Sequence, residues 1–248
     1  MKKLIKSTLL VAASLWSVAT LAAGPTVPLD KAKIDLHDKA SLQRGAQLFM
    51  NYCLGCHSMQ YQRYNRTFKD LEIPEELGME NLQFTGEKVG DLITNAMAST
   101  DASNWFGTPA PDLTLVARVR GADWIYTYLR SFYADDSRPF GVNNAVFPNV
   151  GMPHVLEELQ GIPRQTYERR LVDGQMTDVY VGIKTDGSGM LTSEEYDRAV
   201  NDLTNFLVYT GEPMMLEQRR IGWYVFGFLA VFLVFSVLLK REFFKDVK

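Results

Sequence analysis

The sequence Cys53-Leu54-Gly55-Cys56-His57 constrains this chain more than any other stretch, because it holds the only two cysteines among 248 residues. The C-x-x-C-H spacing attaches a c-type haem: two thiols form thioethers with the vinyl groups, and the following histidine reaches the iron. A structural zinc site needs four Cys or His ligands, and no second cluster of such residues accompanies the motif among only three histidines. A thioredoxin-like pair needs no trailing histidine. The motif predicts one covalent haem c, held by Cys53 and Cys56, with His57 as the proximal iron ligand.

The N-terminal segment has the pattern of a secretory signal peptide. Three lysines lie within the first six residues, an apolar run covers residues 9–21, and two alanines follow. This run is too short and wrongly flanked for a membrane span, so residues 1–23 are predicted to be removed on export. Export agrees with the haem motif, because covalent c-type haem is attached outside the cytoplasm. With both cysteines bound to haem, no structural disulfide is expected.

A second apolar segment lies near the C-terminus. Residues 221–239 (IGWYVFGFLAVFLVFSVLL) carry no charge over 19 positions, which is long enough for a helix to cross a membrane. Four basic residues follow this segment and two precede it, so the positive-inside rule favours a cytoplasmic C-terminus. The prediction is a periplasmic haem domain (24–220), one transmembrane helix (221–239) and a basic cytoplasmic tail (240–248) in a bacterial inner membrane.

The charge of the chain suggests what kind of partner it meets. The formal net charge is −3, and removing the three signal-peptide lysines leaves about −6. An acidic surface steers a basic soluble protein towards it and disfavours nucleic acid.

Two helices are predicted to cross each other around the haem. The first is capped by Ser41 and runs to Met50, with Gly45 and Phe49 on one face. The second follows a capping box at residues 192–195 and ends at Gly211. The first and last helices of a class I cytochrome c cross in this way, with a glycine permitting close approach. The fold class is therefore mainly α: a class I cytochrome c-like haem domain with insertions.

The segments between these helices are less regular. Residues 60–83 are polar and acidic and are expected to form a solvated loop. A helix rich in aromatic residues is predicted from 122 to about 133. The alternation at 178–183 predicts a strand, in a hairpin that closes at 186–189.

The sixth iron ligand has two main candidates, which lie close together. Met152 is flanked by glycine and proline in a non-helical segment, which suits a loop that presents a thioether to iron. Met/His ligation is typical of electron-transfer cytochromes c and raises the potential. His154 is the rival and would give bis-His iron, and residue types alone favour Met152 about two to one. Met79 and Met97 remain further candidates.

Three segments together resemble the cytochrome c1 family, the haem subunit of the bacterial cytochrome bc1 complex (ubiquinol:cytochrome c oxidoreductase). They are CLGCHSMQYQRY (53–64), APDLTLVARVRGADWIYTYLRSFY (110–133) and NNAVFPNVGMP (143–153). The C-terminal span with its basic end completes the resemblance.

The resemblance implies roles for six residues. Cys53 and Cys56 attach the haem, His57 and Met152 ligate its iron, Arg118 pairs with a haem propionate, and Pro111 packs against the haem. The family's Asn-Pro-Tyr-Phe stretch reads Asn-Ala-Val-Phe at residues 144–147, so no role is assigned there.

The resemblance also implies a function. The haem would take electrons from the Rieske iron–sulfur protein and pass them to a soluble or tethered cytochrome c, with cytochrome b as a further partner. The chain would then be an electron carrier by itself and part of an enzyme only as a subunit. Two other readings stay open: a membrane-anchored c-type cytochrome that serves another oxidase, and a haem peroxidase or sensor with an open iron position.

Overall fold

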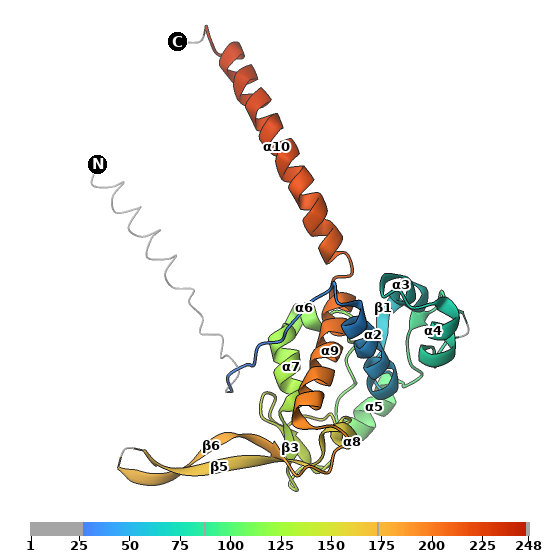
Figure 1. The fold of residues 1–248 in the computed structure, drawn as a ribbon, viewed down its shortest axis with the longest axis vertical. Helices are drawn as coiled ribbons and strands as arrows, with labels where there is room; N and C mark the ends of the chain where they lie inside the picture. The colour runs from blue at the N-terminus through green and yellow to red at the C-terminus, as the bar shows by residue number, and fades with distance from the viewer. Residues whose placement is uncertain (1–26, 87, 173, 247–248) are drawn as a thin grey trace.

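The computed structural model of the chain describes residues 27–86, 88–172 and 174–246. The predicted signal peptide at 1–23 lies outside these residues. Figure 1 shows a largely helical domain from which one long helix projects at one end, while a two-stranded ribbon projects sideways near the other end. The predicted mainly α class is confirmed.

The domain contains short helices around two longer ones. The helices are α2 (Lys39–Leu48), α3 (Tyr64–Asp70), α4 (Glu75–Leu82), α5 (Ser99–Phe106), α6 (Val116–Arg120), α7 (Ala122–Arg130), α8 (Glu157–Gln160) and α9 (Ser193–Gly211), with a π-helical turn η1 (Phe49–Cys53) directly after α2. The strands pair antiparallel, two by two, as β1 (Met59–Arg63) with β2 (Leu92–Ile93), β3 (Phe132–Ala134) with β4 (Val142–Asn144), and β5 (Pro163–Val172) with β6 (Gln175–Thr185).

The centre of the domain is the crossing of α2 and α9, as the sequence predicts. A Cβ atom built on Gly45 would lie 2.1 Å from the carbonyl oxygen of Asp202 and 2.7 Å from Cβ of Phe206. No side chain fits in that space, so glycine sets how closely the helices approach. One turn along, the ring of Phe49 packs on the ring of Phe206, with 5.9 Å between centroids.

The two helices begin at different kinds of cap. Thr192 and Glu195 form the predicted capping box of α9: the Thr192 amide donates to Glu195 Oε2 at 2.9 Å, and the Glu195 amide donates to Thr192 Oγ1 at 3.3 Å. The predicted Ser41 cap of α2 is wrong. The cap is Asp38, whose carboxylate accepts from the Ser41 amide at 3.0 Å, and the Ser41 side chain is buried against α9.

Residues 60–83 are not a solvated loop, which corrects that expectation. They contain β1, α3 and α4, and three apolar side chains anchor them: Phe68, Leu71 and Leu82 are each no more than 8% exposed. The glutamates of this segment are exposed, and the apolar residues between them face the core. Because the glutamates dominate the composition, the segment resembles a solvated loop in the sequence.

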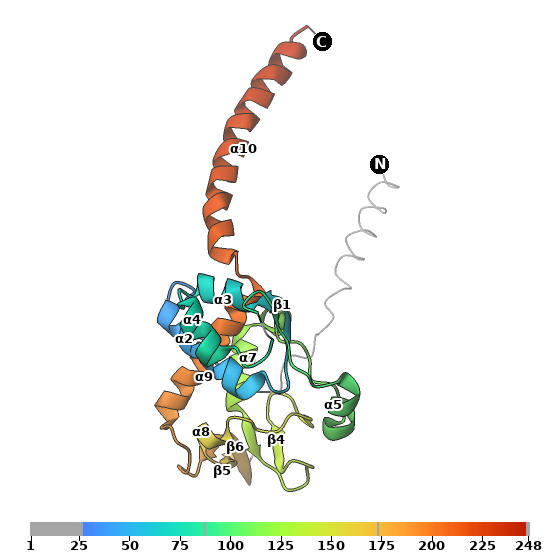
Figure 2. The same cartoon turned by 90° about the vertical axis from the view of Figure 1, so that its right-hand side faces the viewer.

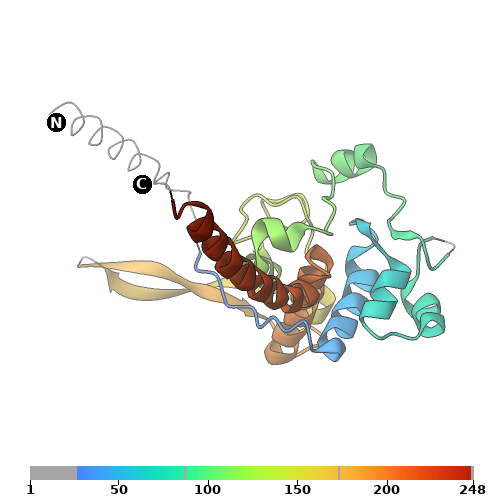
Figure 3. The same ribbon diagram turned by 90° about the horizontal axis from the view of Figure 1, so that it is seen from above.

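The predicted hairpin exists, but it closes before residues 178–183 and not at 186–189. Residues 178–183 lie inside β6, whose partner β5 precedes it, so the chain reverses at Gly174, which has φ of +80°. Residues 186–189 instead connect β6 to α9. There the carboxylate of Asp186 accepts from the Ser188 amide at 3.0 Å. In Figure 3 the ribbon points away from the domain on the side opposite α3 and α4.

The C-terminal helix α10 (Met215–Phe243) contains the predicted span 221–239. It is the helix among the described residues that is long and apolar enough to cross a membrane, and its apolar window is unburied in the structure. Figure 2 shows it leaving the domain next to the end of α9. An apolar helix that touches so little of its own domain is stable only in a lipid or protein environment.

We expect Gly45→Ala to destabilise the domain, because the new methyl group would overlap the backbone of α9. Overpacking of this kind costs about 3 kcal/mol. The measurement is the free energy of unfolding in guanidinium of the protein in detergent. Gly90→Ala is the control, since a Cβ there meets nothing within 4 Å, and its effect should stay within about 0.5 kcal/mol. Equal effects of the two substitutions would contradict the close crossing.

Candidate haem-binding site

The haem motif lies in the turn that ends the first helix. η1 ends at Cys53, and two hydrogen bonds close the turn that follows: the amides of Cys56 and His57 donate to the Cys53 carbonyl at 3.1 and 2.8 Å. This turn brings the three motif side chains to one wall of a cavity. Both thiols are free, that of Cys53 buried and that of Cys56 partly accessible.

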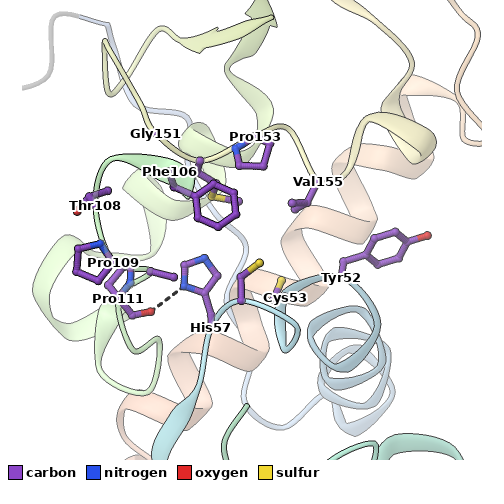
Figure 4. Close-up of a pocket in the computed structure, with 13 residues that line it drawn as sticks. Tyr52, Cys53, His57, Phe106, Thr108, Pro109, Pro111, Gly151, Pro153 and Val155 are labelled. Carbon is purple, nitrogen blue, oxygen red and sulfur yellow. Dashed lines mark hydrogen bonds between the residues drawn. The ribbon is translucent and has the colours of Figure 1, made fainter. Parts of the chain in front are cut away.

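His57 is held in one orientation by a backbone carbonyl. Its Nδ1 lies 2.7 Å from the carbonyl oxygen of Pro111, so this nitrogen carries the proton and donates it (Figure 4). The other ring nitrogen, Nε2, is then the unprotonated one that can bind a metal. Burial lowers the pKa of His57, which also favours the neutral, ligating form. Pro111, expected to pack against the haem, lines the cavity and fixes the histidine as well.

The cavity has two adjoining lobes, which share Cys53, His57, Pro111 and Met152 among their walls. The Cys56 lobe also contains residues of η1 and α5, and Figure 4 shows Phe106, Pro153 and Val155 facing His57 across it. The Arg120 lobe runs between α6, α7 and α9 and encloses about 960 Å³ with its open mouth.

Met152 is the second possible ligand inside the cavity, since it lines both lobes. The hydroxyl of Tyr128 donates to its sulfur at 3.4 Å. The chain reaches this point through a tight passage, because a Cβ on Gly151 would lie 2.6 Å from the carbonyl oxygen of Phe106. The loop is thus held in place on both sides of the thioether.

His154, the rival ligand, faces elsewhere. It lines neither lobe, and its ring stacks on Phe132 with 4.8 Å between centroids and 13° between planes. Burial lowers the pKa of His154 to about 4, so it remains a neutral core histidine near pH 7. The geometry therefore favours Met152 over His154, a choice that residue types left at two to one.

The two arginines of α6 point in different directions. Arg118 lies outside both lobes, and its Nε is 3.1 Å from Oε1 of Glu212 at the end of α9. Arg120 lines the lobe that is named after it. Its guanidinium carbon lies 5.0 Å from the ring centroid of Trp124 and 5.8 Å from that of Phe147. Five of the six residues singled out in the sequence thus share one cavity, and Arg118 does not line it.

The cavity fits a covalent haem. Two thiols and a neutral imidazole stand on one wall, and a thioether lines the cavity as well, between largely apolar residues. Within the described ranges, no group of three His, Cys, Asp or Glu side chains could hold a metal ion.

Several further residues line the cavity without belonging to any site motif in the sequence. In the sequence, Tyr128 and Trp124 are members of an aromatic helical stripe. In the structure their stacked rings, 4.8 Å apart, form a wall of the Arg120 lobe. Leu203 and Leu207 of α9 complete that wall from the far end of the chain. A helical stripe in the sequence indicates burial, but it does not say whether the buried face meets protein or a cofactor.

Comparison with known proteins gives a consistent result. Residues 30–247 match the Cytochrome C1 family. Cytochrome c1 of Allochromatium vinosum is 53% identical over 247 residues, covering all of both chains. The ammonia monooxygenase gamma subunit of Nitrosomonas europaea is 44% identical over 240 residues, 96% of this chain and 97% of that one. The cytochrome b/c1 of Bradyrhizobium diazoefficiens is 23% identical over 242 residues, 84% of this chain and 34% of its own length.

We expect Tyr128→Phe to lower the haem midpoint potential, because the sulfur of Met152 loses a hydrogen-bond donor and then stabilises oxidised iron better. A hydrogen bond of about 0.5–1 kcal/mol corresponds to a shift of roughly 20–40 mV. Redox titration of the purified protein measures the shift. Tyr126→Phe is the control, since the Tyr126 ring packs against Arg130 outside the cavity. A shift of the same size in both variants would contradict an effect of the Tyr128–Met152 hydrogen bond on the potential.

Proposed function

The chain belongs to the cytochrome c1 family, and we propose that it is the electron-transfer subunit of a bacterial cytochrome bc1 complex. In this proposal its single haem c receives electrons from the Rieske iron–sulfur protein and passes them to a soluble or tethered cytochrome c. By itself the chain is an electron carrier, and it contributes to ubiquinol:cytochrome c oxidoreductase activity as a subunit.

The observation that carries the proposal is the donor set of the cavity. Cys53 and Cys56 would hold the haem covalently, and His57 and Met152 would ligate its iron. The haem, when bound, supplies one-electron chemistry. Pro111 keeps the His57 proton on Nδ1, and Tyr128 keeps the thioether oriented. An iron ligated by both side chains would offer no open position to peroxide or a gas, which argues against the peroxidase and sensor readings.

The C-terminal helix supports a membrane-bound assembly. We propose residues 221–239 of α10 as a single transmembrane span, with the haem domain (24–220) in the periplasm after removal of residues 1–23, and residues 240–248 in the cytoplasm. A helix that is apolar on all sides can pack against further membrane helices. A relative whose name joins cytochrome b and c1 supports cytochrome b as the membrane partner.

A second candidate comes from the relative named as a gamma subunit of ammonia monooxygenase. Its alignment spans nearly the whole of both chains, so any such role would use the same haem domain and the same C-terminal helix. The two candidates differ in the electron acceptor rather than in the cavity, since a monooxygenase consumes electrons, and the last experiment below separates them.

We expect Met152→Leu to keep the covalent haem and to lower its potential by roughly 0.1 V or more, since axial ligands set haem potentials over a range of about 0.8 V. The reduced variant should also bind carbon monoxide, which six-coordinate Met/His iron resists. His154→Gln is the matched control and should change neither property. A Met152→Leu protein with unchanged potential, or a large shift in the His154 variant, would exclude Met152 as the ligand.

We expect ubiquinol to reduce the c-type haem of native membranes, and a blocker of the quinol-oxidation site to abolish that reduction. The measurement is the visible absorption band of reduced haem c, with a strain lacking this chain as the control. Reduction that persists in the presence of the blocker, or no reduction at all, would place the electron donor outside a bc1 complex. Oxidation of the reduced haem that requires both ammonia and dioxygen would favour the second candidate, because a monooxygenase consumes two electrons for each ammonia it oxidises.

A further inference from the structure

We propose that Arg138 is a positioning residue for the thioether of Met152. Its guanidinium holds the backbone two and three residues before Met152, and so keeps the sulfur inside the cavity. Arg138 lines neither lobe of the cavity, so it would act only through this loop. The inference rests on the haem of the proposed function, in which Met152 ligates the iron.

The loop that carries Met152 has no helix or strand of its own to hold it. Residues 145–156 connect β4 to α8 through turns and bends. Within this loop Asn149 has φ of +63°, a left-handed conformation that residues other than glycine seldom adopt. Such a conformation persists where the surroundings hold it. The position of Met152 therefore depends on contacts from outside the loop.

The guanidinium of Arg138 supplies contacts of this kind. Its Nη2 donates to the carbonyl oxygen of Asn149 at 3.0 Å and to that of Val150 at 3.3 Å, and its Nη1 donates to Asn149 Oδ1 at 3.4 Å. Hydrogen bonds from a charged donor are stronger than those between neutral groups. Arg138 belongs to the connection between β3 and β4, so these bonds tie the loop of Met152 to the neighbouring loop.

The connection that carries Arg138 is itself well ordered. The carboxylate of Asp135 accepts from the Ser137 amide at 3.1 Å and from Asn143 Nδ2 at 3.0 Å, and the Arg138 amide donates to the Asp135 carbonyl at 3.0 Å. Asn143 lies in β4, and its Oδ1 accepts from the Asn149 amide at 2.8 Å. Asn143 and Arg138 thus hold the two polar backbone groups of Asn149 from one ordered support.

The restraint reaches Met152 through the two residues between it and Asn149. Val150 is buried with Phe132 and Val142 in a small cluster, against which Met152 also packs. Gly151 passes close to the carbonyl oxygen of Phe106, which leaves the chain no room on that side. Without the guanidinium, the carbonyls of Asn149 and Val150 lose their donors, and the loop can carry the thioether away from the iron more often.

The experiment measures the affinity of the reduced, full-length, haem-loaded protein for carbon monoxide, which binds only where Met152 has left the iron. The apparent affinity then rises in proportion to the fraction of open iron. Arg138→Gln should raise this affinity about tenfold, since the loop loses hydrogen bonds to a charged group. The absorption band of Met-ligated ferric haem should weaken in the same variant.

Arg63→Gln is the matched control. The Arg63 guanidinium also donates to a backbone carbonyl, that of Gly90, but the residue lines neither lobe. Its substitution should change the affinity for carbon monoxide by less than about twofold.

A second pair of variants separates positioning of Met152 from general loosening of the cavity. In a Met152→Leu background the iron is already open, so adding Arg138→Gln should change the affinity for carbon monoxide by less than about twofold. Arg138→Lys keeps a charged donor but loses the planar fork. Its affinity should lie between those of the wild type and Arg138→Gln.

Three outcomes would overturn the inference: no rise in affinity with Arg138→Gln, an equal rise with Arg63→Gln, or a further tenfold rise when Arg138→Gln is added to Met152→Leu. If Arg138→Gln fails to fold, Arg138→Lys replaces it in each comparison, and an unchanged affinity would again contradict the role of Arg138. A wild-type protein that lacks covalent haem, or that binds carbon monoxide as readily as Met152→Leu, is a separate result. It would contradict the proposed function or its Met152 ligand.

Discussion

The contact of Gly45 with the carbonyl of Asp202 is the constraint on which the rest of this domain depends. Because the helices touch backbone to backbone, the turn after α2 presents the haem motif towards the side chains of α9. Leu203 and Leu207 of α9 then form part of the cavity wall, although they lie about 150 residues beyond the motif. Arg44 strengthens the crossing through its ion pair with Asp202, at 2.6 Å. The lack of a side chain at Gly45 thus fixes the position of the haem motif relative to α9.

Features encoded by near neighbours could be predicted from the sequence. The C-x-x-C-H spacing, the box of Thr192 with Glu195 and the apolar run of α10 each depend on residues within a few positions of one another. The cap of α2 was harder, because Asp38 and Ser41 are both good capping residues and only burial of Ser41 decides between them. Closure of the hairpin at Gly174 also escaped prediction, since the Gly-Ser-Gly sequence at 187–189 has the stronger turn composition.

The parts of the site that depend on tertiary contacts could not be derived from residue types. The carbonyl that orients His57 belongs to Pro111, and carbonyls carry no sequence signature. The choice between Met152 and His154 needed the stacking of His154 on Phe132. Arg118 and Arg120 have the same chemistry, and only the rotation of a five-residue helix separates the one that faces Glu212 from the one that faces the cavity.

The connection between α9 and α10 consists of residues 212–214 alone, and both of its ends are held. Glu212 pairs with Arg118, and the sulfur of Met214 accepts from the Arg66 guanidinium at 3.1 Å. A domain joined to its anchor by so short a link cannot tumble freely or sweep a wide volume above a bilayer. Its redox centre would stay at a nearly constant height, so any change of distance during electron delivery has to come from the donor and the acceptor.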